Sequence, residues 1–280
     1  ELLKKGLLLE PPKSIQGEAY LGCRNHWKTM KLPSGGVATV HSYVMEDFMR
    51  SCVQLYEELA PGVKLRKVAT PFLADDHRDS AARGPAGDGP VEVCPWCECP
   101  HAPNTWPSIE AYDKYTAKQR KRLEAETSAK LDSSVRGRLA PVAARILMKI
   151  LYGARTARLD LLRAVSHLAC FFTKWTLECD KKLHRLVSYI ASSYHVRMMG
   201  WVGDPLDRLE PHMFADADFA GCVSTQRSTS GLFLCIRGPN TCFPVAGVSK
   251  RQGCVSHSTP EAEAVAMDFA LRINGLPSLI

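Results

Sequence analysis

Two acidic clusters in the last third of the sequence carry residue types that could do chemistry. The first contains Asp216 and Asp218. Side chains two residues apart point to the same face of a strand, so the sequence predicts a carboxylate pair on one strand face. Small and apolar neighbours would bury this pair, and buried carboxylates are costly unless a cation or a donor compensates them. Mg²⁺ is commonly held by one or two carboxylates with water and phosphate, so this cluster is a candidate magnesium site.

The second cluster runs from Ser258 to Glu263 and predicts the start of a helix. A serine or threonine can cap the first turn, proline is favoured at the first helical position, and glutamates suit the positive end of the helix dipole. Glu261 therefore has two interpretations, as a capping acid or as a functional carboxylate. Apolar residues at helical spacing from 263 to 271 predict that one face of this helix is buried.

Two apolar runs lie between the clusters, Gly231–Ile236 and Cys242–Ala246, with the turn signal Arg237–Asn240 between them. Pro244 weakens the later strand or places it at an edge or a bulge, because proline cannot donate a ladder hydrogen bond. The predicted local order is strand, strand, strand, helix.

The ordered motifs of this region resemble the ribonuclease H region of copia-type retrotransposon polyproteins. The matching segments are Ala-Asp-Ala-Asp-Phe-Ala-Gly at 215–221, Arg-Ser-Thr-Ser-Gly at 227–231, Ser-Lys-Arg-Gln at 249–252, and the second acidic cluster. The resemblance implies that Asp216 and Glu263 are catalytic acids, two of the carboxylates that hold a pair of Mg²⁺ ions in the complete family domain. Pro260 and Ala264 depart from the family pattern.

The similarity extends upstream to the reverse transcriptase region of the same polyproteins. Arg158–Val165 resembles its Arg-Pro-Asp segment, with Leu159 in place of the proline, and Lys182–Ile190 resembles the basic helix that follows. Tyr20–Cys23 and Val68–Pro71 are similar to landmarks of the thumb region.

Between these thumb landmarks, Gly35 and Gly36 predict a hairpin turn, and the apolar spacing of residues 43–59 predicts a helix. His167 lies on an apolar helical face and is predicted to be a hydrogen-bonded core residue rather than a metal ligand.

Together these features predict an α+β or α/β fold, in which a thumb-like and connection-like helical region precedes a partial ribonuclease H-like fold of three strands and a helix. Four segments are expected along the chain. They are a reverse transcriptase thumb-like region at 1–72, a linker or insert with a cysteine-rich segment and a charged helix at 73–138, a helical connection region at 139–200, and the N-terminal half of a ribonuclease H-like domain, truncated, at 201–280.

The family's polymerase palm would lie before residue 1 and its last ribonuclease H aspartates after residue 280. The sequence is therefore interpreted as a fragment of a retrotransposon Pol polyprotein with an incomplete catalytic set, and we expect hydrolysis by this chain alone to be absent or very slow. Leu73–Asp76 mimics the Tyr-x-Asp-Asp turn of the palm and is interpreted as a loop. The alternatives are a non-catalytic nucleic-acid-binding module domesticated from a transposon and a zinc-dependent interaction protein.

A formal charge of +7 and a pI near 8.8 favour an anionic partner. With the resemblance, the expected partners are an RNA·DNA hybrid or another nucleic acid, and the rest of the polyprotein. The candidate nucleic-acid contacts are Lys181, Lys182, Arg185, Arg227 and Lys250. No apolar run reaches the ~18 residues of a membrane span, so no membrane partner is expected and the location is predicted to be intracellular, cytoplasmic or nuclear.

The sequence has eleven cysteines but does not predict a disulfide scaffold. Several stand alone in apolar segments and are expected to be free and to pack as small apolar side chains: Cys170, Cys222, Cys235 and Cys242. The exception is a Cys-x-x-Cys motif, which can form half of a zinc site, although a structural site needs four ligands. The candidate zinc ligands are Cys94, Cys97, Cys99 and His101.

Overall fold

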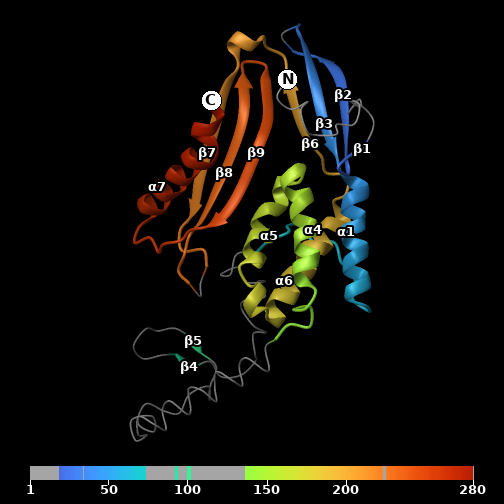
Figure 1. Cartoon of the computed structure of the whole chain (residues 1–280), viewed down its shortest axis with the longest axis vertical. Coiled ribbons are helices and arrows are strands. Elements are labelled where there is room, and N and C mark those ends of the chain that lie inside the picture. Colours follow the sequence, from blue (N-terminus) through green and yellow to red (C-terminus); the bar gives the residue numbers. More distant parts are fainter. Residues whose placement is uncertain are drawn as a thin grey trace, which may run out of the picture.

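The computed structural model describes residues 19–33, 35–73, 92–93, 100–101, 136–222 and 225–279 of the chain (Figure 1). Residues 92–93 and 100–101 form a two-stranded antiparallel ribbon, β4 (Glu92–Val93) and β5 (Pro100–His101). Three predictions within the segment 73–138 fall outside the described residues: the cysteines of the zinc motif, the charged helix, which was expected at residues 112–131, and the Asp-Asp pair at 75–76.

One antiparallel sheet of seven strands runs through the described part of the chain, in the order β1-β2-β3-β6-β9-β8-β7. Its strands are β1 (Ala19–Tyr20), β2 (Cys23–Lys31), β3 (Val37–Val44), β6 (Met198–Val202), β7 (Glu210–Asp218), β8 (Thr229–Gly238) and β9 (Thr241–Arg251). Strand β3 pairs with β6, so the strands before residue 45 and those after residue 197 share one sheet. With the helices below, this confirms the predicted α+β class, while the four segment boundaries stay predictions.

The turns of this sheet follow the predicted punctuation. Between β2 and β3, Gly35 adopts a φ of +84°, which glycine allows without steric cost. Between β8 and β9, the turn is held by Asp204, which accepts hydrogen bonds from the backbone N–H of Asn240 at 2.6 Å and from the hydroxyl of Thr241 at 2.8 Å. The pairing register shifts next to Pro244, which is the bulge predicted for that proline.

The helices are α1 (Glu46–Leu59), α4 (Ala143–Thr156), α5 (Leu162–Ala169), α6 (Leu177–Ser192) and α7 (Thr259–Ala270). Short helical turns are η2 (Leu159–Leu161), η3 (Phe172–Lys174), η4 (Leu206–Arg208), the π-helical η5 (Leu271–Gly275) and η6 (Leu276–Leu279). The predicted helix over 43–59 begins at Glu46 instead, because residues 43 and 44 complete β3. None of the helices in the described ranges is long and apolar enough to span a bilayer.

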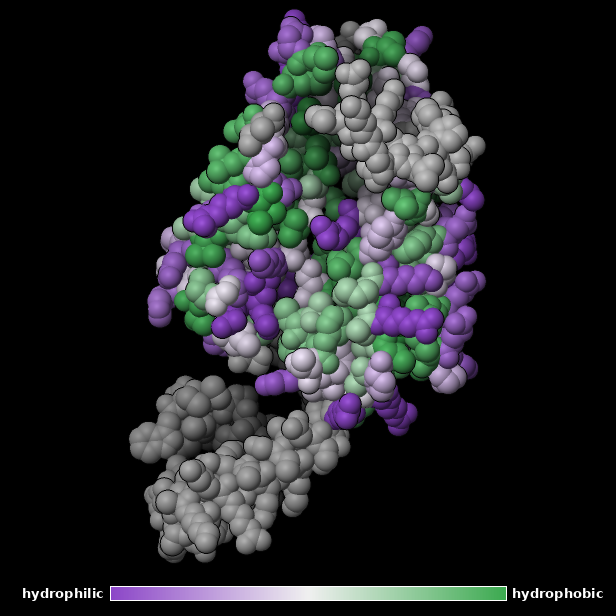
Figure 2. Space-filling view, viewed as in Figure 1, coloured by the Kyte–Doolittle hydropathy of each residue, from purple (hydrophilic) through white to green (hydrophobic). Residues whose placement is uncertain are grey.

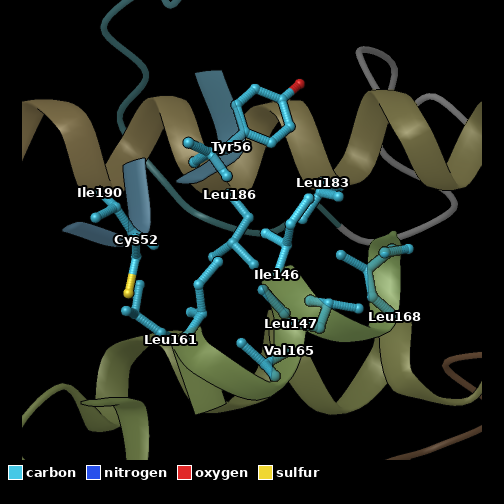
Figure 3. Packing of buried hydrophobic residues seen from close by; sticks show 14 of the residues in the cluster. Cys52, Tyr56, Ile146, Leu147, Leu161, Val165, Leu168, Leu183, Leu186 and Ile190 are labelled. Carbon is cyan, nitrogen blue, oxygen red and sulfur yellow. The ribbon is translucent and has the colours of Figure 1, made fainter. Parts of the chain in front are cut away.

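The main hydrophobic core lies between α1, α4, α5 and α6 (Figure 3). Ile146, Leu147 and Ile150 recur at helical spacing on α4 and are fully buried, which places one face of this helix against the others. Each such side chain contributes about 1.5–3 kcal/mol by leaving water. Tyr56 of α1 crosses this core to His184 of α6, with 3.1 Å between its hydroxyl and Nδ1.

Arg158 is the largest fully buried side chain in the described ranges, and its hydrogen-bond partners are Asp160, from the same sequence motif, and Ser193, just after α6. Its guanidinium donates to both carboxylate oxygens of Asp160, at 2.9 and 2.8 Å. It also donates to the carbonyl oxygen of Ser193 at 2.8 Å and to the hydroxyl of the same serine at 2.9 Å. The Arg-Leu-Asp segment therefore fastens the turn before α5 to the end of α6.

Two layers of helix enclose the last three strands. Helix α7 lies along β7 and β8 on one side, and the bundle of α4, α5 and α6 lies on the other (Figure 1). Ala217 of β7 packs against Ala262 and Ala266 of α7, and these small side chains allow a close approach of helix and strand. His167 of α5 is buried and lies 3.1 Å from Lys182 Nζ, as expected for a hydrogen-bonded core histidine.

The described cysteines are free. Cys222 and Cys235 are buried and Cys242 is half-buried, as expected for small apolar side chains. Cys170 is exposed, because it follows α5 at the point where the helix ends and turns away from the core.

Candidate functional site

Strand β7 carries the first acidic cluster and presents it to a groove. Ala217 faces α7, so the alternation of the strand turns Asp216 and Asp218 to the opposite face, as the sequence predicted for the pair. The predicted burial of the pair is wrong: Asp216 is exposed and Asp218 is half-buried, because this face of the strand borders an open groove. Both carboxylates line a groove of about 410 Å³ between β7, β8 and β9 and the start of α5. Leu159, Leu162 and Arg163 of η2 and α5 line its other side.

The two carboxylates differ in their partners. Asp218 forms an ion pair with Arg163, with 2.5 Å between the carboxylate and Nη2, and it also accepts a hydrogen bond from the backbone N–H of Thr229. Phe72 lies over the same guanidinium, with 4.6 Å between its ring centroid and Cζ. Asp216 has no hydrogen-bond or ion-pair partner among the described residues. The pair thus consists of one engaged and one unengaged carboxylate.

The second acidic cluster begins α7 as predicted. The side chain of Ser258 caps the helix by accepting a hydrogen bond from the backbone N–H of Glu261 at 3.3 Å, and Pro260 stands in the first turn. The carboxylate of Glu261 accepts a hydrogen bond from the backbone N–H of His257 at 2.7 Å. Of the two interpretations of Glu261, the contacts match that of a capping acid.

Glu263 is half-buried on α7 and has no hydrogen-bond or ion-pair partner in the described part of the chain. It follows Ala262, which packs against the helix-facing side of β7, whereas Asp216 projects from the groove side of that strand. The two acids implied by the resemblance therefore stand on different sides of β7. No contact that joins them is among the described interactions.

Hydrogen bonds from one buried residue, Gln252, connect several of the sequence motifs. Its Nε2 donates to the hydroxyl of Ser230 at 3.0 Å and to the carbonyl oxygen of Ala262 at 2.9 Å. Its own backbone N–H donates to the carbonyl oxygen of Ser228 at 2.8 Å. Gln252 thereby joins the Arg-Ser-Thr-Ser-Gly segment, the Ser-Lys-Arg-Gln segment and α7. The order of the motifs in the sequence was a signal of this cluster, but nothing in the spacing identified the glutamine as its centre.

A magnesium site of the kind implied by the resemblance needs several carboxylates that converge. Within the described ranges, no group of three or more His, Cys, Asp or Glu side chains is arranged to hold a metal ion. Asp216 offers one unengaged carboxylate, while Asp218 is occupied by Arg163 and Thr229. The described residues do not complete a two-metal site by themselves, and magnesium stays a prediction for Asp216 and Glu263. The zinc site also stays a prediction, because Cys94, Cys97, Cys99 and the side chain of His101 lie outside the described residues.

The basic residues predicted to contact nucleic acid separate into two groups. Lys181 and Arg185 lie on α6, where Lys181 is exposed and Arg185 Nη2 donates to the hydroxyl of Thr70 at 3.1 Å. Arg185 Nε is buried and has no partner among the described residues. Lys182 is engaged by Glu178 at 2.6 Å.

The other two residues lie outside α6. Lys250 is exposed and its Nζ lies 5.1 Å from the ring centroid of Phe269. Arg227 is half-buried in the loop before β8, where its carbonyl oxygen accepts a hydrogen bond from the backbone N–H of Cys222. Lys250 therefore belongs to the α7 side of the strands, and Arg227 belongs to the loop before β8.

The extended segment 64–70 runs beside α6 and adds further basic side chains to this surface. It contributes exposed basic side chains, and the hydrogen bond from Arg185 to Thr70 ties the segment to the helix. Burial and the charge of Arg66 lower the pKa of His184 on α6, which places a positive field at this surface. We call this set the α6 basic surface: Lys64, Arg66, Lys67, Lys181 and Arg185. The sequence analysis missed its first three members, because they are separated from α6 by more than a hundred residues.

No protein-family model matches the chain, and no curated protein or solved structure matches it significantly.

Proposed function

We propose that this chain is a nucleic-acid-binding segment of a copia-type retrotransposon Pol polyprotein, spanning the end of a reverse transcriptase and the first part of a ribonuclease H-like domain. The observation that carries the proposal is the unit of β7, β8, β9 and α7. Gln252 hydrogen-bonds to Ser230 and to Ala262 at the start of α7, so segments that carry the resemblance pack against one another, which supports the proposal. The carboxylate of Asp216 is left unengaged beside this unit.

The proposed ligand is an RNA·DNA hybrid, bound through its phosphates. The α6 basic surface gathers five cations, and the chain as a whole carries a formal charge of +7. Lysine and arginine neutralise phosphates and release the counterions condensed on them, so affinity that arises this way falls steeply with salt concentration. Lys182 contributes less to this surface, because Glu178 neutralises it.

The proposal includes no cleavage by this chain alone. In the complete family domain, Mg²⁺ would activate water and stabilise the leaving oxygen. The described residues supply Asp216 and Glu263 from different sides of β7 and no third acid beside them. The same observation favours the second candidate function, a non-catalytic module that binds nucleic acid through the α6 basic surface.

A further part of the polyprotein is the proposed protein partner. Strand β7 is the edge of the described sheet, and a strand edge offers unpaired backbone groups to another strand. Exposed apolar side chains continue along α7 and the turns after it (Figure 2): Met267, Leu271, Ile273, Leu276 and Leu279. This surface supports packing of additional chain against α7 and β7.

The test is a titration of the purified chain with a fluorescently labelled RNA·DNA hybrid, read by anisotropy over a range of salt concentrations. We expect the logarithm of the affinity to fall linearly with the logarithm of the salt concentration. The double variant Lys181→Glu, Arg185→Glu should weaken binding and flatten the slope, while Asp207→Asn, an exposed change away from this surface, should not. Binding that is insensitive to salt, or unchanged in the double variant, would contradict the proposal.

Hydrolysis of the same hybrid in Mg²⁺ tests the claim that this chain alone does not cleave. Binding without cleavage is expected from both candidate functions. Cleavage that disappears in Asp216→Ala would show that this chain already holds a working acid set, and it would overturn the claim that the chain alone does not cleave.

A further inference from the structure

The groove beside Asp216 is built from three aligned rows of residues on β7, β8 and β9. The middle row is Asp216, Gly231 and Ser249, because the strand register pairs Asp216 with Gly231 and Gly231 with Ser249. Paired residues of antiparallel strands project to the same face. Adjacent strands are about 4.8 Å apart, so Asp216 and Ser249 are roughly 10 Å apart at the backbone, with a glycine between them.

Neither polar end of this row has a partner within the described residues, but the two ends differ in burial: Asp216 is exposed to the open groove, whereas the hydroxyl of Ser249 is buried. The carboxylate of Asp216 has no partner among the described residues, and the hydroxyl of Ser249 is buried without a hydrogen-bond partner. Buried polar atoms are almost always paired, so an orphan hydroxyl that lines a groove marks a place where a ligand atom belongs. Asp218, one row away, is already satisfied by Arg163 and Thr229.

The centre of the row is open. A Cβ atom added to Gly231 would meet only the carbonyl oxygen of Asp216, at 3.9 Å, so the glycine leaves a flat strip of backbone as the floor of the groove. By contrast, Gly247 in the next row is filled, since a Cβ there would lie 3.1 Å from Leu159. The open space is therefore above Gly231, between the exposed carboxylate of Asp216 and the unpaired hydroxyl of Ser249.

The neighbouring row supplies aromatic surface. Phe214 and Phe233 are register partners, and their rings lie 6.3 Å apart between centroids with planes 28° from parallel. Phe214 is 49% exposed, so its ring is accessible from the groove. Together with Leu159 and Leu162 these rings make the groove mostly apolar, and its volume of about 410 Å³ is within the range of small-molecule sites.

We propose that this groove binds a nucleobase, and guanine in preference to the others. A planar base lies over Gly231 and contacts Phe214 and Phe233. The two oxygens of Asp216 accept hydrogen bonds from N1–H and N2–H of guanine, the two adjacent donors that no other common base presents together. The hydroxyl of Ser249 meets the opposite edge of the ring. The inference rests on the proposed function only for the source of the base, which is an unpaired nucleotide of a bound nucleic acid.

The test is calorimetric titration of the full chain with GMP, AMP, CMP, UMP and ribose 5-phosphate. We expect GMP to bind most tightly. Asp216→Asn should weaken GMP binding by about 10-fold to 100-fold, as for loss of a hydrogen bond to a charged group. Gly231→Val should abolish it by filling the floor of the groove, while Gly253→Val, at a glycine with nothing within 4 Å, should leave it unchanged. Circular dichroism and melting of each variant establish that it is folded.

Equal affinity for GMP and ribose 5-phosphate, or an unchanged affinity in folded Gly231→Val, would overturn the inference. So would tighter binding of N-acetylarginine amide than of GMP, because the groove would then be a site for a guanidinium group of a peptide. Hybrid binding measured on the same preparations distinguishes the two proposals. Loss of hybrid binding with intact GMP binding refutes the proposed function alone, and the reverse result refutes the nucleobase site alone.

Discussion

The two faces of the sheet formed by β7, β8 and β9 differ in whether their polar side chains have hydrogen-bond partners. Under α7, Gln252 satisfies the hydroxyl of Ser230 and the carbonyl oxygen of Ala262 with one amide. On the groove side, Asp216 and the hydroxyl of Ser249 have no partner among the described residues. Both faces are built from the same motifs, since Ser249 and Gln252 belong to a single four-residue segment.

We infer from this contrast that the hydrogen-bonded groups stabilise the fold and that the groups without a protein partner are available to a ligand. A buried polar group that is hydrogen-bonded contributes modestly to stability, but one whose partner is removed costs its full desolvation penalty. Substitutions at the satisfied groups should therefore destabilise the chain. Substitutions at the exposed Asp216 or at the buried, unpaired Ser249 should not destabilise the chain and should affect binding instead.

The largest loss of stability is expected for Arg158→Ala, since Arg158 is the most completely satisfied buried charge in the described ranges. The substitution leaves Asp160 and the carbonyl oxygen of Ser193 without their donor. We expect a loss of about 3–5 kcal/mol in the free energy of unfolding, measured by urea denaturation. Arg155→Ala, at an exposed position of the same region, should change it by about 0.5 kcal/mol or less. Equal effects of the two substitutions would contradict the account.

A smaller loss is expected for Gln252→Leu, which keeps the volume of the side chain and removes its hydrogen bonds. Ser230 and Ala262 then lose their partner in a buried position, at a cost of about 2–3 kcal/mol in the free energy of unfolding. Backbone amides of α7 should exchange faster with deuterium than in the parent chain. Gln54→Leu on the exposed side of α1 serves as the control. An α7 that exchanges at the parent rate would show that the amide does not hold the helix.

A satisfied buried histidine in the other half of the sheet should make stability depend on pH. The ring of His41 stacks on Trp27, with 4.4 Å between centroids, and shares a hydrogen bond with Asn25 at 3.0 Å. Burial lowers the pKa of His41 in the folded chain, so folding favours the neutral ring. The contribution is complete above the unfolded pKa of about 6.5 and is lost as the pH falls through the lower folded pKa.

We therefore expect a lower melting temperature near pH 5.5 than near pH 7.5. His184 adds to the difference with the same sign, because burial and Arg66 lower its pKa. His41→Phe, which keeps the stack on Trp27, should reduce the difference without abolishing it. A variant with the full parent difference would exclude His41 as a source of the pH dependence.

No loss of stability is expected for the groove. Ser249→Ala removes a buried hydroxyl that has no partner, so the free energy of unfolding should stay unchanged or rise by up to about 1–3 kcal/mol. Gly231→Ala should be neutral or stabilising by up to about 1 kcal/mol, because glycine is unfavourable in a strand and the added Cβ meets nothing closer than 3.9 Å. A loss above about 2 kcal/mol at either position would mean that the groove face holds the fold after all.

Local patterns predicted much of this region because they act over a few residues. The alternation that turns Asp216 and Asp218 to one face, the cap at Ser258 and the bulge at Pro244 all follow from neighbouring residue types. The ion pair between Arg163 and Asp218 could not be predicted this way, because it joins residues 55 apart through the packing of α5 on the strands.

The pairing of β3 with β6 was beyond prediction for the same reason, since two stretches separated by most of the chain meet in one sheet. Nor could the sequence show that Ser249 would lack a partner. Whether a buried hydroxyl has a hydrogen-bond partner depends on every residue that packs around it, and these neighbours are known only from the folded structure.

The most direct test of the difference between the faces is an NMR titration of the chain, selectively labelled at phenylalanine, with GMP. Phe214 and Phe233 line the groove, whereas Phe269 lies beside Lys250 on the α7 side. We predict that the ring signals of Phe214 and Phe233 shift as GMP is added and that those of Phe269 do not. Shifts at Phe269 with unchanged signals at Phe214 and Phe233 would contradict the assignment of the groove as the face left for a ligand.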